Sequence, residues 1–136
     1  MSFDVVLSEL RSLYGAHLFQ QGESNSPRTR LTESDVQRWS TMIGGTRNSA
    51  YDAIALHLAR GFHSSELPYA LCDAIVNDLF GIITSTGSEW PELFFEVYCA
   101  FDAGEYYHRD RPTEDPVELY TRPMISKIVA AYSESN

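Results

Sequence analysis

The chain has 136 residues, of which 43% are hydrophobic and 21% are charged. This composition can build one folded domain with a sizeable core, and it excludes disorder throughout. The 19 acidic residues outnumber the 10 basic ones and give a net charge of −9, which argues against a nucleic-acid partner because such binding depends on neutralising phosphates. We therefore expect a single domain over residues 1–136.

Apolar residues at helical spacing predict a first helix over residues 3–18. The polar stretch 22–31 that follows has loop composition, and we expect a mobile loop there. A second helix is expected to begin near Thr32 or Ser34, since both have capping-box-like spacing, and to end at Gly44.

The middle of the chain predicts three further helices. A third helix over residues 48–60 is expected to end at Gly61, and a fourth follows Ser65 with Pro68 in its first turn. A fifth helix is expected to begin at Ser88. Its predicted inner face consists of Trp90, Leu93, Phe94, Val97 and Phe101.

Gly104 is expected to interrupt the fifth helix. A short turn from Asp115 to Tyr120 then precedes a final helix that opens at Thr121 to Pro123. No segment shows the alternation of apolar and polar residues that is typical of strands. The sequence therefore predicts an all-α, single-domain bundle of about six helices.

Signals for secretion or membrane insertion are not visible in the sequence. No apolar run approaches the roughly 18–20 residues that a membrane helix needs, and the N-terminus lacks the pattern of a signal peptide. Cys72 and Cys99 both lie in apolar-periodic segments, which predicts reduced, buried thiols. We expect a cytoplasmic protein that does not bind membranes.

The charge is distributed unevenly along the chain. Residues 66–118 hold twelve acidic residues and two arginines, whereas residues 1–65 are neutral overall. Acidic residues that gather on one surface speed association with a basic partner. The alternative is a solvated acidic face that only maintains solubility.

Aromatic residues are concentrated in the same region, where seven of the eighteen residues from Trp90 to Tyr107 are aromatic. Phe95, Tyr106 and Tyr107 do not fit the predicted inner face, so they are exposed interface residues or are covered by another helix. An acidic loop over residues 109–115 would extend the negative surface. The predicted partner-binding residues are Glu89, Glu92, Glu96, Tyr106, Tyr107, Asp110, Glu114, Asp115 and Glu118.

Catalytic and metal-binding motifs are weak. Glu105 and His108 have the spacing of di-iron bundle ligands, but that chemistry needs a second such pair, and the sequence has none. No nucleophile elbow or complete phosphate-binding loop is present. We therefore expect no metal, no cofactor and no enzymatic activity.

These observations favour a small acidic module that neutralises a basic protein. Its most concrete form is an immunity or inhibitor protein for a bacterial toxin such as a nuclease. Two alternatives remain open. One is a helical enzyme with an acidic pocket, for which Glu105, His108, Asp73 and Asp78 are the first residues to test. The other is a structural module that forms a homodimer through its aromatic surface.

Overall fold

The computed structural model describes residues 5–10, 12, 31–87, 90–105 and 113–133. Their regular structure is helical and includes no strand, which confirms the all-α class. Residues 5–10 form a helical segment, and residues 13–30, with most of the expected loop, lie outside the described part. The elements that follow are α2 (Glu33–Met42), α3 (Arg47–His63), α4 (Tyr69–Thr86), α5 (Glu92–Asp102), the π-helical turn η1 (Val117–Thr121) and α6 (Arg122–Ser133).

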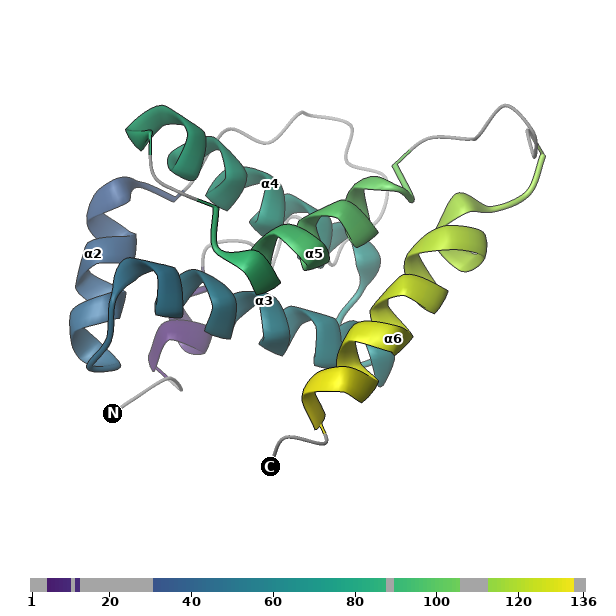
Figure 1. The fold of residues 1–136 in the computed structure, drawn as a ribbon, viewed down its shortest axis with the longest axis horizontal. Helices are drawn as coiled ribbons and strands as arrows, with labels where there is room; N and C mark the ends of the chain where they lie inside the picture. Colours follow the sequence, from purple (N-terminus) through teal and green to yellow (C-terminus); the bar gives the residue numbers. More distant parts are fainter. Residues whose placement is uncertain (1–4, 11, 13–30, 88–89, 106–112, 134–136) are drawn as a thin grey trace.

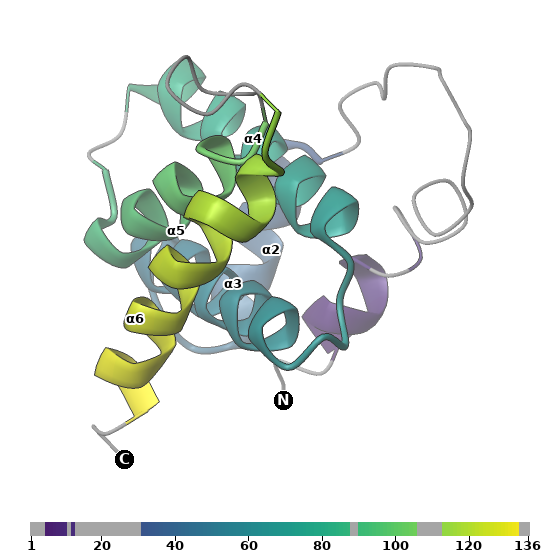
Figure 2. The ribbon, with the colours of Figure 1, turned by 90° about the vertical axis from the view of Figure 1, so that its right-hand side faces the viewer.

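Helix α3 lies at the centre of the bundle, where it packs against α2, α4, α5 and α6. Helices α5 and α6 cover one side of α3, and residues 5–10 lie on the other side (Figures 1 and 2). Because α3 is covered on several sides, most of its side chains are buried or half-buried. Tyr51, Ile54 and Leu58 are among its buried side chains.

The starts of α2 and α3 follow local capping rules. Thr32 and Asp35 form a capping box at the start of α2, which selects the first of the two starts that the spacing allows. Thr46 and Ser49 form a second box at the start of α3. Gly44 and Gly87 adopt left-handed conformations just after α2 and α4, with φ of 76° and 71°.

The expected end of the third helix at Gly61 is wrong, since α3 continues to His63. Gly61 has a packing role instead: a Cβ atom at this position would collide with the side chain of Leu67, which is buried against it. The chain turns at Ser65, which has φ of 68°. A glycine is required at position 61 because the Leu67 side chain approaches the backbone closely, and not because the helix ends there.

Two other boundaries differ from the prediction. Helix α5 begins at Glu92 with Pro91 as its N-cap residue, not at Ser88, and it ends before Gly104 as expected. The turn η1 continues directly into α6, so the expected short turn and final helix form one continuous helical segment. Ile125 and Ile128 of α6 are buried.

Candidate partner-binding face on α5

Helix α5 is held at its start by a side chain from another helix. Pro91 cannot supply a capping hydrogen bond, and the backbone N–H of Phe94 instead donates to Oδ1 of Asp52 on α3, at 2.8 Å. A carboxylate at this position also interacts favourably with the helix dipole. Asp52 therefore fixes the N-terminus of α5 on α3.

The C-terminal end of α5 is fixed in a similar way. The hydroxyl of Tyr69 donates to the carbonyl of Phe101 at 2.6 Å, and the hydroxyl of Thr121 donates to the carbonyl of Ala100 at 2.7 Å. A side chain at Gly104 would collide with Thr121, so this glycine allows η1 to approach. Residues of α3, α4 and η1 together make α5 a rigid platform.

One side of this platform carries an aromatic row, which we define as Phe80, Trp90, Phe95 and Tyr98. The rings of Phe80 and Tyr98 are stacked with centroids 4.3 Å apart, and Trp90 lies 5.0 Å from Phe80 and 5.1 Å from Phe95. Trp90 is 41% exposed and Phe95 is 42% exposed. The row thus presents two rings to solvent.

The exposure of Trp90 corrects the predicted inner face, although its other four members are buried as expected. Trp90 precedes the first turn of α5, so helical spacing does not direct its ring into the core. The ring packs on Phe80 of α4 instead. Phe95 is exposed, as its poor fit to the predicted inner face indicated.

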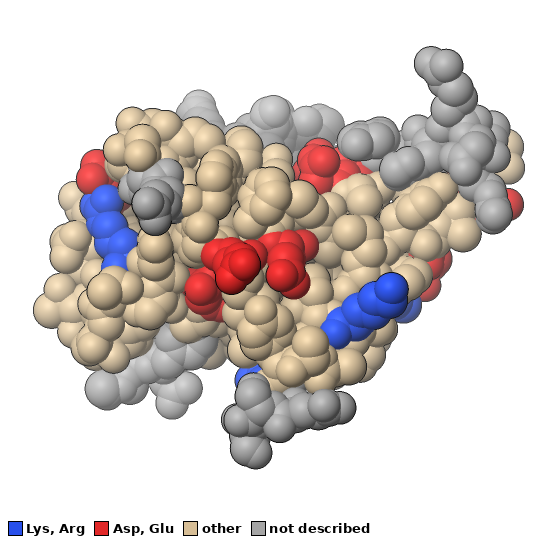
Figure 3. All heavy atoms as spheres, in the orientation of Figure 1, with Lys and Arg blue, Asp and Glu red and all other residues tan. Residues whose placement is uncertain are grey.

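Beside the aromatic row, α5 and the neighbouring α3 carry an acidic flank, which we define as Asp52, Glu92 and Glu96. Tyr132 of α6 lies close enough to sense all three carboxylates. The pKa of its hydroxyl is raised first by burial and then by the charges of Glu96, Glu92 and Asp52. On the molecular face shown in Figure 3, acidic side chains gather near the middle, over α3 and α5. The Lys and Arg visible in the same view lie toward the edges. We call the acidic flank and the aromatic row together the α5 face.

A second group of carboxylates, the carboxyl cluster of Asp73, Asp102 and Glu105, joins α4 to the end of α5. Burial, followed by a hydrogen bond and charge from Glu105, raises the pKa of Asp73 to about 8. Two carboxyl groups form such a bond only if one holds a proton. Asn77 donates to Oε2 of Glu105 at 2.9 Å, while Oδ1 of Asp73 is buried without a hydrogen-bond partner.

The other predicted binding residues lie either around η1 or outside the described part of the chain. Glu114, Asp115 and Glu118 are exposed near η1, where Glu118 forms an ion pair with Arg122 at 3.0 Å. This pairing compensates part of the charge that was expected to extend the negative surface. Glu89, Tyr106, Tyr107 and Asp110 lie outside the described residues, as do His108 and residues 109–112 of the expected acidic loop.

Both cysteines are free. Cys72 is buried, and burial raises the pKa of its thiol to about 12. Cys99 is only half-buried, which differs from the expected burial, because it lies on the outward side of α5 between Phe95 and Asp102. Burial and then Asp102 also raise the pKa of this thiol, so neither cysteine has the features of a reactive nucleophile.

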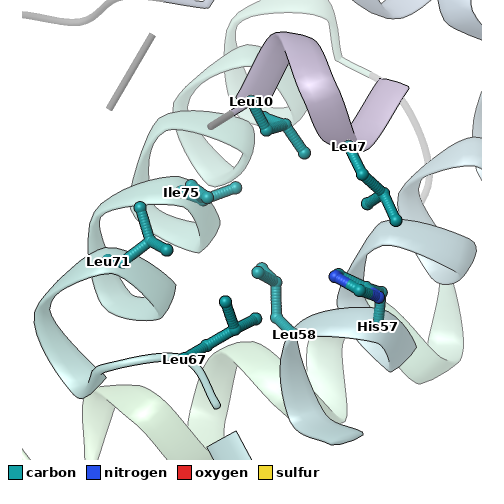
Figure 4. Close-up of a pocket in the computed structure, with 7 residues that line it drawn as sticks. All are labelled: Leu7, Leu10, His57, Leu58, Leu67, Leu71 and Ile75. Carbon is teal, nitrogen blue, oxygen red and sulfur yellow. The ribbon is translucent and has the colours of Figure 1, made fainter. Parts of the chain in front are cut away.

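An apolar pocket lies between the N-terminal helical residues, α3 and α4 (Figure 4). It contains about 270 Å³ of space not filled by protein atoms, part of which is open solvent. Among the described residues that line it, His57 is the only polar one. The pocket is lined by Leu7, Leu10, His57, Leu58, Leu67, Leu71 and Ile75.

Comparisons of the chain with protein-family models, with curated proteins and with solved structures found no match. Across the part of the chain that the structure describes, no group of three or more His, Cys, Asp or Glu is arranged to hold a metal ion. None of the described helices combines the length and apolar character that crossing a membrane requires.

Proposed function

We propose that the protein is a small acidic binding module that neutralises a basic protein by docking the α5 face on it. In its most concrete form it is an immunity or inhibitor protein for a bacterial toxin such as a nuclease. The observation that carries this proposal is the combination of exposed aromatic rings and exposed carboxylates at the start of one rigid helix.

The charge of the face suits this role. A nuclease binds its substrate with a positively charged cleft, because it must neutralise phosphates. Glu92 and Glu96 are both exposed and lie one helical turn apart, with Asp52 beside Glu92. Such a negative surface accelerates encounter with a basic partner and favours it over acidic competitors.

The rigidity of α5 also supports docking. Its two ends are tied to other elements by Asp52, Tyr69 and Thr121, so little conformational entropy is lost when the face binds. Trp90 and Phe95 supply the aromatic area that commonly anchors protein interfaces. We place this function in the cytoplasm, where two free thiols are stable.

The carboxyl cluster favours a second candidate function, acid–base catalysis. Asp73 and Glu105, which the sequence suggested as test residues for an enzyme, share a hydrogen bond, and the pKa of Asp73 at about 8 suits proton transfer near neutral pH. Asp73→Asn would abolish such an activity, whereas charge reversal at Glu92 and Glu96 would leave it unchanged.

The test of the binding function is charge reversal on the acidic flank. The basic protein that co-purifies with the chain from native extract is identified, and its association rate is then measured over a range of salt concentrations. The double variant Glu92→Lys/Glu96→Lys should lower this rate about 10- to 100-fold at low salt and flatten the salt dependence.

The matched control is Glu66→Lys, which reverses an exposed charge in the connection between α3 and α4. This connection lies on the far side of the bundle from α5 (Figure 2). The control should associate nearly as fast as the wild type. An unchanged rate for the Glu92/Glu96 double variant would show that the α5 face is not the contact surface.

A further inference from the structure

Trp90 and Phe95 form a pair of exposed rings beside the start of α5. The two ring centroids are 5.1 Å apart, and the ring planes meet at 53°. Phe80 of α4 packs against Trp90, and the ring centroid of Tyr98 lies 6.4 Å from that of Phe95, both on α5. Both outer rings are thus supported by other rings, while more than a third of each residue remains open to solvent.

Carboxylates lie next to these rings. Glu92 precedes Phe95 by three residues in α5, and side chains at this spacing are neighbours on a helix surface. Glu96, which follows Phe95 directly, is also exposed. A cation placed on the ring of Phe95 is therefore within reach of a negative charge.

The same combination occurs within the protein, where an arginine completes it. The guanidinium of Arg122 lies 4.4 Å from the ring centroid of Phe62, and its Nε donates to Glu118 at 3.0 Å. The guanidinium of Arg38 lies 5.9 Å from the centroid of Trp39 and forms ion pairs with Glu9 and Asp35. In both places, a ring and a carboxylate bind one guanidinium together.

Arginine suits such a site better than lysine. A guanidinium is planar, so it can stack on a ring while it donates two parallel hydrogen bonds to a carboxylate. An ammonium group is more strongly hydrated and lacks this flat surface. We infer that Trp90, Phe95 and Glu92 form a subsite for an arginine side chain of the partner. This inference rests on the proposed binding function, because it specifies which basic residue the α5 face selects.

The experiment compares an arginine hexapeptide with a lysine hexapeptide of equal length and charge. Binding to the full chain is followed by NMR at low salt, with the Trp90 indole N–H and the α5 amides as reporters. The arginine peptide should bind about three- to tenfold more tightly than the lysine peptide and should shift the Trp90 signal most.

Two variants define the origin of this preference. Phe95→Leu keeps apolar area but removes the ring, and Trp90→Leu does the same at the second position. Each should reduce the arginine preference, and the double variant should abolish it while lysine binding changes little. Because both positions are exposed, the variants should fold, and their amide spectra check this directly.

The outcomes separate this inference from the proposed function. Equal binding of both peptides at the α5 face would overturn the arginine subsite and leave the binding function standing. A preference that persists in the double variant would also overturn the subsite. If neither peptide shifts the α5 amides at low salt, the docking function itself fails.

Discussion

Two groups of three carboxylates lie near the two ends of α5, and Glu92 and Glu96 of the first group are more exposed than Asp73 of the second. In the acidic flank, Glu92 and Glu96 are exposed, and one helical turn separates them. In the carboxyl cluster, Asp73 lies in the contact between α4 and α5 and shares a hydrogen bond with Glu105. The first group places carboxylates on the surface, whereas burial and the neighbouring Glu105 favour the protonated form of Asp73 in the second.

This difference shows that residue type alone does not decide what an acidic residue does. A carboxylate in water keeps its charge at little cost, but one removed from water favours its neutral form. A nearby carboxylate strengthens the effect, and the neutral form can then donate a hydrogen bond. The contrast can be tested by removing members of each group in turn.

The largest effect on stability is expected in the carboxyl cluster. The pKa of Asp73 is about 8 in the folded protein, above the ordinary value of 3.8. The folded state therefore binds this proton more tightly, so the contribution of Asp73 to stability is greatest below pH 4 and is lost as the pH rises to about 8. Asp73→Asn should stabilise the protein at about pH 8.5 by about 1–3 kcal/mol, a range reduced for the partial exposure of the group.

Urea unfolding of the wild type and of Asp73→Asn at about pH 5 and about pH 8.5 measures this effect. The wild type should lose more stability than the variant between the two conditions. Glu105→Gln should also weaken the pH dependence, because it removes the neighbouring charge that raises the pKa of Asp73. Parallel pH profiles for the wild type and Asp73→Asn would show that no proton is held in the cluster.

A smaller effect is expected at Asp52, the member of the acidic flank that also caps α5. Asp52→Ala removes the acceptor for the N–H of Phe94 and should lower the free energy of unfolding by about 1–2 kcal/mol. Asp52→Asn keeps an acceptor and relieves repulsion from Glu92, so its cost should be about 0.5 kcal/mol or less.

The control for this prediction is Thr32→Ala, which removes a local cap from α2 and should cost about 1 kcal/mol. Hydrogen exchange distinguishes the two positions. Asp52→Ala should raise the exchange rate of the Phe94 amide, whereas Thr32→Ala should leave it nearly unchanged. Equal protection of Phe94 in the wild type and Asp52→Ala would contradict the capping role.

The capping residues also show how far the sequence can predict the fold. Thr32 and Asp35 are three residues apart, so their capping box follows from spacing alone. Asp52 and Phe94 are 42 residues apart, and nothing local links them. The helices were therefore predictable as elements, but the contact that fixes the start of α5 depends on tertiary packing.

The candidate site was predictable to a similar degree. Helical spacing correctly placed Phe95 off the inner face of α5, because this residue lies within the regular helix. The same pattern failed for Trp90, which precedes the helix. The sequence singled out Asp73 and Glu105 for one alternative function, but only the packing of α4 on α5 shows that their carboxyl groups meet.

The smallest effect is expected from neutralising the exposed part of the acidic flank. Glu92→Gln/Glu96→Gln removes two charges from a well-solvated surface, so stability should change by about 0.5 kcal/mol or less. The pKa of Tyr132 should fall, because both charges raise it, although burial should keep it above its ordinary value. An NMR pH titration of the Tyr132 ring measures this shift, with Asp73→Asn as the control. If the pKa of Tyr132 does not fall, the charges of Glu92 and Glu96 on α5 do not reach Tyr132 on α6. A clear fall in this pKa with an unchanged free energy of unfolding would show that these carboxylates shape the surface charge without stabilising the fold, in contrast to Asp73.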